Sequence, residues 1–367
     1  MPLTYISLCS GIEAASVAFT PLGWTSIAFS EIEPFPSKLL NHHYPSIPNH
    51  GDFTKFDWSI YQGSVDVLVA GTPCQAFSVA GLRNSLADAR GNLTLEFIRA
   101  ANAIRPKYII WENVPGVLST KDNAFGCFLA GLVGSAETIS LNKRWSNAGV
   151  VHGPARRAAW RVLDAQYFGL AQQRKRVFVV ASAGDGRDPA QVLFEWEGLQ
   201  RNSAPSRSPE EEASPNFAQL FNAEGSVGAT LTASNIGKHL NNQTPLVVHG
   251  TQDPCIIDIA FSLQRNGGRE NVLVFDPTQI TSPYNKSNPK PGDPCHTLSK
   301  TTHPPVITHK FTVRRLTPIE CERLQGFPDN YTLISPNTKD TPRYKAIGNS
   351  MAVPVMRWIG ERILNAR

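Results

Sequence analysis

Apolar residues gather in this chain into short runs that are separated by longer segments with helical spacing. The runs at 5–8, 25–30, 65–70 and 108–111 are rich in apolar residues and are bounded by glycine, proline or polar residues. Such runs are typical of strands buried on both faces of a sheet. Because helical segments alternate with them, the pattern predicts an α/β fold with a doubly wound, mostly parallel sheet.

Further elements follow from the same pattern and from capping signals. Thr317 before Pro318 predicts a helix start, since threonine caps helices and proline suits their first position. From about residue 183 the chain is rich in glycine, proline, serine and asparagine, which predicts a second region of loops and short strands. The remaining predictions are strands at 159–164 and 176–181, a helix ending near 104, and helices at 34–41, 318–324 and 353–364.

The run at 65–70 ends in Gly71-Thr72-Pro73-Cys74. Open α/β sheets carry their chemistry at the carboxyl ends of the strands. Pro73 restricts the backbone next to the cysteine, so the sequence predicts that Cys74 is presented at the rim of the sheet as a nucleophile. The alternative is a buried structural cysteine.

The run at 108–111 ends in Glu112-Asn113, which predicts that Glu112 emerges at the same edge as Cys74. A carboxyl group beside a nucleophile favours a general-acid role. The alternative is an ordinary turn residue before Pro115-Gly116.

The first strand leads into Ser10-Gly11, without the further glycines of a dinucleotide-binding turn. The turn therefore suits a ligand without phosphates. Glu31 ends the second strand, where an acidic residue commonly accepts hydrogen bonds from ribose hydroxyls. Asp52 and Phe53 together suit the amino group and ring of an adenine, although the pair could also form a simple turn.

Composition and charge narrow the classes of protein. The length of 367 residues predicts two domains, and six scattered cysteines without a C-x-x-C pair imply neither a disulfide framework nor a zinc site. No apolar run is long enough to span a membrane, so we expect a cytoplasmic protein. The net charge is +5, and residues 143–176 carry eight basic residues against the single acid Asp164. That block predicts a phosphate-binding surface, with a solvated basic face as the alternative.

Taken in order, these motifs closely resemble those of the cytosine-5 DNA methyltransferases. The resemblance covers nearly the whole chain outside about 183–310. It is carried by Ser10-Gly11, Glu31, Asp52, Gly71-Thr72-Pro73-Cys74-Gln75 with Phe77-Ser78, Asp88-Ala89-Arg90-Gly91-Asn92-Leu93, Glu112-Asn113-Val114, Gln172-x-Arg174-x-Arg176, Arg314-x-Leu316-Thr317-Pro318-x-Glu320 with Arg323 to Pro328, and Gly348-Asn349-Ser350-Met351.

The resemblance implies a Rossmann-like class I methyltransferase fold that uses S-adenosylmethionine as the methyl donor. It implies a catalytic domain at 1–183, a target-recognition domain at 184–339 and a C-terminal helix at 340–367 that returns to the first domain. The cofactor-binding residues that it implies are Cys9, Ser10, Gly11, Ile12, Glu31, Ile32, Asp52, Phe53, Pro73, Leu93, Asn349 and Ser350.

The resemblance also implies a mechanism. Cys74 would add to carbon 6 of a cytosine flipped out of the duplex, while Glu112 donates a hydrogen bond or proton to ring nitrogen 3. Arg176 matches the residue that contacts the cytosine O2, and Arg174 matches a supporting arginine.

The partner implied is double-stranded DNA, bound by a monomer, with a cognate restriction endonuclease where a restriction system exists. Amide and guanidinium groups suit adenine and guanine edges. The DNA-binding residues that we predict are Gln75, Ser78, Arg90, Arg156, Arg157, Gln264, Arg265, Asn266 and Arg269. For residues 264–269 the alternative is an ordinary polar hairpin turn.

Three positions depart from the family pattern. Cys9 stands where the family usually has an aromatic residue, Glu13 replaces a second glycine, and Thr72 replaces a proline. The altered first turn resembles phage and prophage members. Alternatives to a DNA enzyme are an RNA cytosine methyltransferase, a non-catalytic DNA-binding protein and, less in keeping with the turn, a nicotinamide oxidoreductase.

Overall fold

The structure is a computed structural model, and its chain divides into two compact units. It describes residues 2–72, 93–120, 123–140, 144–184, 188–195, 274–275, 306–309 and 312–365. One unit comprises Met1–Asp164, Lys175–Gln200 and Ser350–Arg367, and the other comprises Ala165–Arg174 and Arg201–Asn349. The domain bounds expected from the sequence remain a prediction.

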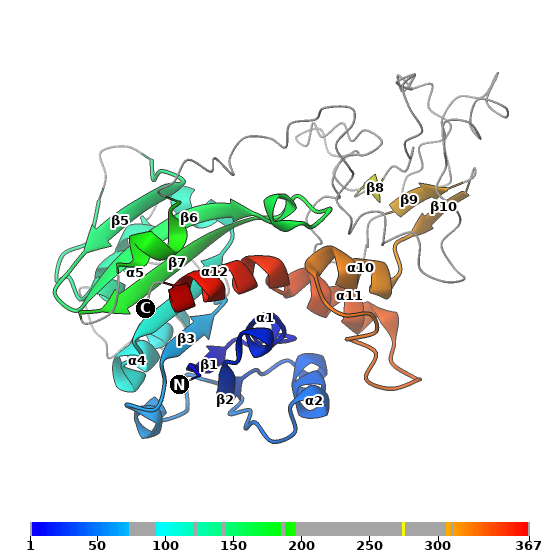
Figure 1. The fold of residues 1–367 in the computed structure, drawn as a ribbon, viewed down its shortest axis with the longest axis horizontal. Helices are drawn as coiled ribbons and strands as arrows, with labels where there is room; N and C mark the ends of the chain where they lie inside the picture. Colours follow the sequence, from blue (N-terminus) through cyan, green and yellow to red (C-terminus); the bar gives the residue numbers. More distant parts are fainter. Residues whose placement is uncertain are drawn as a thin grey trace. The chain divides into compact units, whose positions relative to one another are not determined.

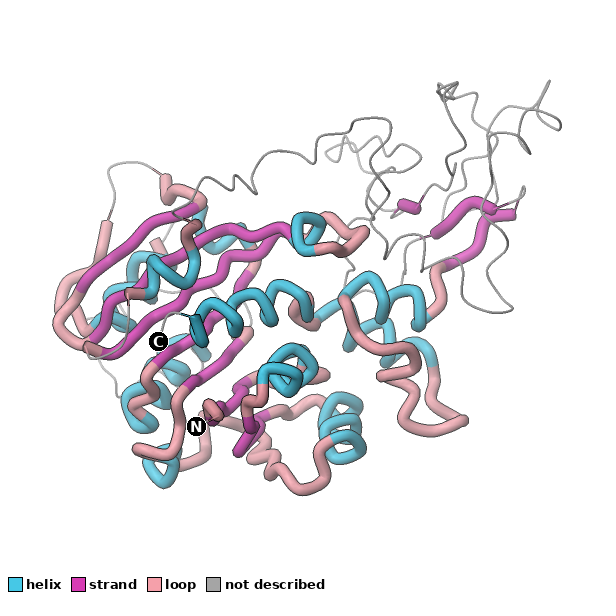
Figure 2. The backbone as a smooth tube through the Cα atoms, viewed as in Figure 1, coloured by secondary structure: helices cyan, strands magenta, loops and turns pink. Residues whose placement is uncertain are grey.

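The first unit contains a seven-stranded sheet in the order β2-β1-β3-β4-β7-β6-β5. Neighbours among β2, β1, β3 and β4 are parallel, and the pairs β4-β7, β7-β6 and β6-β5 are antiparallel. In Figure 2 the long β6 and β7 run side by side. The strands are β1 (Thr4–Leu8), β2 (Thr25–Ser30), β3 (Val67–Ala70), β4 (Tyr108–Asn113), β5 (Ala148–His152), β6 (Arg156–Asp164) and β7 (Lys175–Ala183).

The central strands are buried on both faces, as their continuous apolar runs predict. β3 and β4 have no exposed residue, and in β1 only Thr4 is partly exposed. Alternate side chains of β1, β3 and β4, such as Ile6, Leu68 and Trp111, join one large apolar core with Phe97 and Phe128. This rigid layer fixes the carboxyl ends of β3 and β4 next to each other.

Helices flank the sheet in two groups (Figure 1). α1 packs against α12, which also packs against α6, while α4 packs against α5. The two groups fit opposite faces, because right-handed crossovers from β1 to β2 and from β3 to β4 leave the centre in opposite directions. The helices are α1 (Ala14–Phe19), α2 (Pro34–His43), α4 (Leu93–Ile104), α5 (Ala124–Val133), α6 (Pro189–Leu193) and α12 (Val353–Asn365).

The second unit contains α10 (Pro318–Gln325), α11 (Asp340–Asn349) and an antiparallel sheet in the order β10-β9-β8. The strands of this sheet are β8 (Val274–Phe275), β9 (Val306–His309) and β10 (Thr312–Arg315). Thr317 caps α10 in a capping box, since its hydroxyl accepts from the Glu320 backbone N–H and the Glu320 carboxylate accepts from the Thr317 N–H at 2.7 Å. The predicted start of this helix is confirmed.

The predicted α/β fold is confirmed, and the sheet, expected to be mostly parallel, has three parallel and three antiparallel strand pairs. The predicted strands and helices occur within a few residues of their expected bounds, and β5, α5, α6 and α11 were not predicted. No helix in the described part of the chain is long and apolar enough to cross a membrane.

Candidate active site

The carboxyl ends of β3 and β4 place Gly71 and Glu112 in close contact. β3 and β4 are parallel neighbours, with Ala70 opposite Trp111. A Cβ atom on Gly71 would lie 3.3 Å from the Glu112 Oε2 and 2.9 Å from the terminal methyl of Met351. A side chain at position 71 would therefore displace the ends of the Glu112 and Met351 side chains. The carboxyl group of Glu112 lies beside the exit of β3, as predicted.

Glu112 forms an ion pair with Arg176. The Arg176 Nε lies 3.0 Å from the Glu112 Oε1, and the two side chains are 15% and 11% exposed. Arg176 comes from β7, which runs antiparallel to β4 and therefore begins at the edge where β4 ends. Two predicted catalytic residues from distant parts of the sequence are thus brought together.

Asn113 ties this edge to the end of β3. Its amide Nδ2 donates a hydrogen bond to the Thr72 carbonyl oxygen at 3.0 Å. Thr72 is the last described residue before Pro73-Cys74. The predicted residues Pro73, Cys74, Gln75, Ser78 and Arg90 lie outside the described residues.

The first turn is organised by Glu31. Its carboxylate accepts hydrogen bonds at 2.7 Å from the backbone N–H of Gly11 and of Glu33. Gly11 has a φ of 55°, a conformation that favours glycine. Ser10 joins β1 to β2, since its N–H donates to the Ser30 carbonyl oxygen at 3.0 Å. These contacts bring together three predicted cofactor residues.

Cys9 lies in an acidic environment between the two strand ends. Burial, together with the negative charges of Glu31 and Asp52, raises the pKa of the Cys9 thiol to about 12. Asp52 accepts from the Thr54 hydroxyl at 2.8 Å, which lowers the pKa of this carboxyl. Beside Glu31, the apolar side chain of Ile32 is 69% exposed. The edge therefore combines carboxylates with an exposed apolar surface.

Other predicted cofactor residues are more enclosed. Ile12 is fully buried, Ser350 is 6% exposed and Leu93 is half-buried at the start of α4. Phe53 is 6% exposed and belongs to the apolar core, so its side chain packs mainly within the protein. Adenine stacking on Phe53 remains a prediction.

Glu13, which replaces a glycine of the family pattern, has a structural position at the start of α1. It has a φ of 60°, is 1% exposed and caps α1 by accepting from the Ser16 N–H at 3.0 Å. The Ser16 hydroxyl also donates to it and lies 2.6 Å from the Tyr5 hydroxyl. Burial raises the pKa of Glu13 to about 7, although the hydrogen bonds from Ser16 and Ser7 oppose the rise. The carboxyl group that replaces a glycine is thus part of the helix cap.

Within the second unit, Arg174 is 2% exposed and its Nη2 donates to the Gly348 carbonyl oxygen at 3.1 Å. Asn349, the neighbour of Gly348, is exposed at the end of α11. Gln172 is fully buried and donates to the Leu324 carbonyl oxygen at 2.9 Å. Gln172 and Arg174 are therefore anchored within their unit to α10 and α11.

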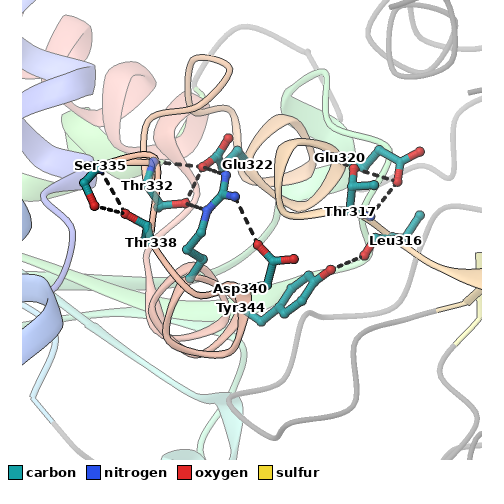
Figure 3. Close-up of polar contacts among 10 residues, drawn as sticks. Leu316, Thr317, Glu320, Glu322, Thr332, Ser335, Thr338, Asp340 and Tyr344 are labelled. Atoms are coloured by element: carbon teal, nitrogen blue, oxygen red, sulfur yellow. Dashed lines mark hydrogen bonds and ion pairs between the residues drawn. The ribbon is translucent and has the colours of Figure 1, made fainter. Parts of the chain in front are cut away.

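A buried polar network stabilises the same unit (Figure 3). Glu322 is fully buried and pairs with Arg343, whose Nη2 lies 3.2 Å from the Glu322 Oε1. That oxygen also accepts from the Thr332 N–H at 2.8 Å, and the Tyr344 hydroxyl donates to the Leu316 carbonyl oxygen at 2.6 Å. These bonds join α10, α11 and the loop between them.

Comparison with known protein families matches residues 3–365 to the C-5 cytosine-specific DNA methylases. The chain belongs to this family. It is therefore a DNA (cytosine-5)-methyltransferase, and the resemblance inferred from its motifs is confirmed.

Individual proteins are also similar along most of this chain. M.HpaII of Haemophilus parainfluenzae, a Type II methyltransferase, is 29% identical, with 98% of this chain and 89% of that protein covered. A protein of Escherichia phage P1, named a DNA N-6-adenine-methyltransferase, is 40% identical over 99% of this chain. This chain spans 61% of the length of the phage protein.

Solved structures show the same methyltransferase fold. The Dnmt2 methyltransferase of S. pombe matches with a TM-score of 0.59 and 15% identity, over 99% of this chain and 98% of that one. A protein encoded within an E. coli prophage matches with a TM-score of 0.54 and 18% identity, over 99% of both chains. At these identities the likeness concerns the fold.

The basic block of this methylase is not one surface, and the prediction for Arg156 is wrong. Arg156 is 7% exposed, and its guanidinium donates to Asn102 at 2.8 Å and to the carbonyl oxygens of Ala101 and Leu132 at 3.1 Å. Burial lowers the pKa of this guanidinium. Arg156 therefore holds β6 to α4 and α5, while the phosphate-binding role of Arg157 remains a prediction.

Two further side chains at this edge, Trp111 and Met351, were not predicted as site residues. Trp111 ends the predicted strand at 108–111 and Met351 ends the last family motif, each next to a predicted site residue. That adjacency is the only signal in the sequence that could have found them. The predicted base-reading residues Gln264, Arg265, Asn266 and Arg269 lie outside the described part of the chain.

Proposed function

We propose that this methylase transfers a methyl group from S-adenosylmethionine to carbon 5 of a cytosine flipped out of duplex DNA, through a covalent bond to Cys74. The observation that carries the proposal is the Glu112–Arg176 pair, 3.0 Å apart at the exit of β3. A cytosine ring accepts hydrogen bonds at N3 and O2. A carboxyl group and a guanidinium at this place match these two acceptors.

The chemistry follows from the weakness of carbon 5 as a nucleophile. Addition of the Cys74 thiolate to carbon 6 forms a carbon–sulfur bond, and protonation or hydrogen bonding of N3 by Glu112 accepts the displaced charge. Carbon 5 of the enamine would then take the methyl group of S-adenosylmethionine, whose bond to the sulfonium breaks so that S-adenosylhomocysteine leaves. Loss of the carbon 5 proton and elimination of the thiolate then restore the aromatic ring and the free enzyme.

Two arginines have proposed roles in holding the base. We assign Arg176 to the cytosine O2, where a guanidinium stabilises the charge that develops on the ring. We assign Arg174 to support of the site, on its match to the family motif alone. Extrusion of the base costs a few kcal/mol, which contacts of this kind offset.

The residues of the first turn fit S-adenosylmethionine, which supplies a methyl group activated by a sulfonium cation. Glu31 and Asp52 make this edge acidic, and their charges add to the effect of burial in raising the pKa of Cys9. Negative charge suits a cationic sulfonium and disfavours phosphates. We propose that Glu31 holds the ribose hydroxyls and that the exposed Ile32 contacts the adenine ring.

The proposed substrate is a specific duplex sequence, read by the region between the two motif blocks. Relatives of this chain are named Type II methyltransferases, which supports a role beside a restriction endonuclease. We propose that Gln264, Arg265, Asn266 and Arg269 read base edges and that the protein acts as a monomer in the cytoplasm.

Bisulfite sequencing of DNA from cells that express the chain will identify the methylated sequence. A duplex with 5-fluorocytosine at that site should then trap the parent protein in a complex that resists denaturation, because fluorine cannot leave as the proton does. Cys74→Ala should not be trapped. Trapping of Cys74→Ala, or methyl transfer to RNA and not to DNA, would contradict the proposal.

A further inference from the structure

The hydroxyl and carbonyl groups of Thr72 are held by side chains of β4. The Trp111 Nε1 donates to the Thr72 Oγ1 at 2.8 Å, and the Asn113 Nδ2 donates to the Thr72 carbonyl oxygen at 3.0 Å. Thr72 is 3% exposed, so neither bond competes with much water. A proline at this position would have no hydroxyl to accept from the indole.

Trp111 is a rigid donor. It is fully buried, lies opposite Ala70 in the sheet and packs on Phe128 of α5, with ring centroids 4.2 Å apart. Its indole N–H therefore has a fixed direction. The position of Thr72 is set by the packed core of the sheet.

Thr94 brings a third element to the same point. The hydroxyl oxygens of Thr72 and Thr94 lie 3.4 Å apart, and Thr94, in the first turn of α4, is 1% exposed. Thr72 precedes residues 73–92, and Thr94 follows them after a single residue. Both roots of the segment that carries Cys74 therefore meet at one buried cluster.

We propose that the cluster of Thr72, Thr94, Trp111 and Asn113, here called the root clamp, positions Cys74 for attack on the cytosine. The inference rests on the proposed role of Cys74. A segment whose two ends are held together has fewer conformations than one with a free end. Displacement of a reacting group by about 1 Å can lower a rate by about 100-fold. Thr72 and Thr94 are thus positioning residues.

The test uses full-length variants that remove or keep one hydroxyl. Thr72→Val keeps the shape and removes the acceptor, and Thr72→Ser keeps the acceptor. Thr94→Val removes the other hydroxyl without leaving the Trp111 N–H unsatisfied. Thr4→Val is the matched control, since the Thr4 hydroxyl bonds the Ser64 carbonyl oxygen at 2.7 Å at the opposite ends of β1 and β3.

The measurement is the rate of covalent trapping on 5-fluorocytosine DNA, together with affinities for DNA and S-adenosylmethionine and the melting temperature. We expect Thr72→Val to trap roughly 10- to 100-fold more slowly with unchanged affinities. Thr94→Val should be slowed less, and Thr72→Ser and Thr4→Val should trap at the parent rate.

Three results would overturn the root clamp. They are a parent-like rate for Thr72→Val, an equally slow rate for Thr72→Ser, and a slowing by Thr4→Val as large as that by Thr72→Val. If Thr72→Val does not fold, a parent-like rate for Thr94→Val has the same meaning. Trapping of Cys74→Ala would instead overturn the proposed nucleophile, so the two failures are distinguishable.

Discussion

Glu112–Arg176 and Glu322–Arg343 are ion pairs of the same chemistry in different surroundings. Their closest nitrogen–oxygen distances are 3.0 and 3.2 Å. Glu112 and Arg176 lie at strand ends, with side chains 11% and 15% exposed. The side chains of Glu322 and Arg343 are 0% and 6% exposed and share Thr332 as a further partner.

The difference concerns what can reach each pair. A pair that keeps some exposure at the carboxyl edge of a sheet can exchange its partner for a substrate group. A pair enclosed with its hydrogen-bond partners has a structural role, because loss of either member leaves a buried charge. We therefore expect mutations of the first pair to change activity and mutations of the second to change stability.

Glu112→Gln should have the largest effect. The amide keeps the shape and an acceptor for Arg176 but removes the acid, so turnover should fall by about 10²–10⁴-fold with little change in DNA affinity or melting temperature. Single-turnover methylation and gel-shift binding measure the two effects. Normal turnover would leave Glu112 with a structural role only.

Glu322→Gln should lower the free energy of unfolding by about 3–5 kcal/mol, because Arg343 would remain buried without its carboxylate. The matched control is Asp340→Asn, which removes the other carboxylate near Arg343. The Asp340 Oδ1 lies 3.2 Å from the Arg343 Nη1, and the Asp340 side chain is 61% exposed. That control should cost less than about 1 kcal/mol. Urea unfolding measures the loss of stability in both variants. Equal losses would contradict the distinction between an enclosed and an exposed carboxylate.

Glu13 is a buried carboxyl group that forms no ion pair with an arginine in the described part of the chain. Burial raises the pKa of Glu13 from 4.5 to about 7. Between pH 4.5 and pH 7 the folded state therefore keeps a proton on this carboxyl group that the unfolded state has lost. Its contribution is therefore fully present below about pH 4.5 and is lost as pH rises to about 7, with a magnitude of order 3 kcal/mol.

Glu13→Gln removes this titration and keeps an acceptor for Ser16. Relative to the parent, the variant should be more stable at pH 8 than at pH 5. Urea unfolding at the two pH values measures the difference. An identical difference between variant and parent at both pH values would show that Glu13 does not titrate in this range.

Arg157 should show the smallest effect. If it contacts phosphate, Arg157→Gln should reduce the slope of log affinity against log salt by about one. Arg156→Gln is the control, because this residue is buried on carbonyl oxygens. It should lower stability by about 1–3 kcal/mol and leave the slope unchanged. A reduced slope for Arg156→Gln, with an unchanged slope for Arg157→Gln, would show that Arg156 contacts DNA phosphate.

The sequence by itself determined the central strands, several helix bounds and the family motifs. Apolar runs stopped by glycine or by polar residues specify β3 and β4, and Thr317-Pro318 specifies the start of α10, because these signals are local. Local signals did not reveal α5 or β5. α5 is apolar on nearly every side, so it lacks amphipathic spacing, and β5 is a half-exposed edge strand that pairs only with β6.

Only the tertiary structure decided the roles of residues that look alike in the sequence. Arg156 and Arg176 belong to the same basic run, yet one binds carbonyl oxygens of α4 and α5 and the other faces Glu112. The antiparallel register of β4, β7 and β6 separates them. Likewise Thr72 and Thr94 meet because β3 and α4 are packed on the same core, and a contact of that kind depends on packing between distant segments that no local pattern encodes.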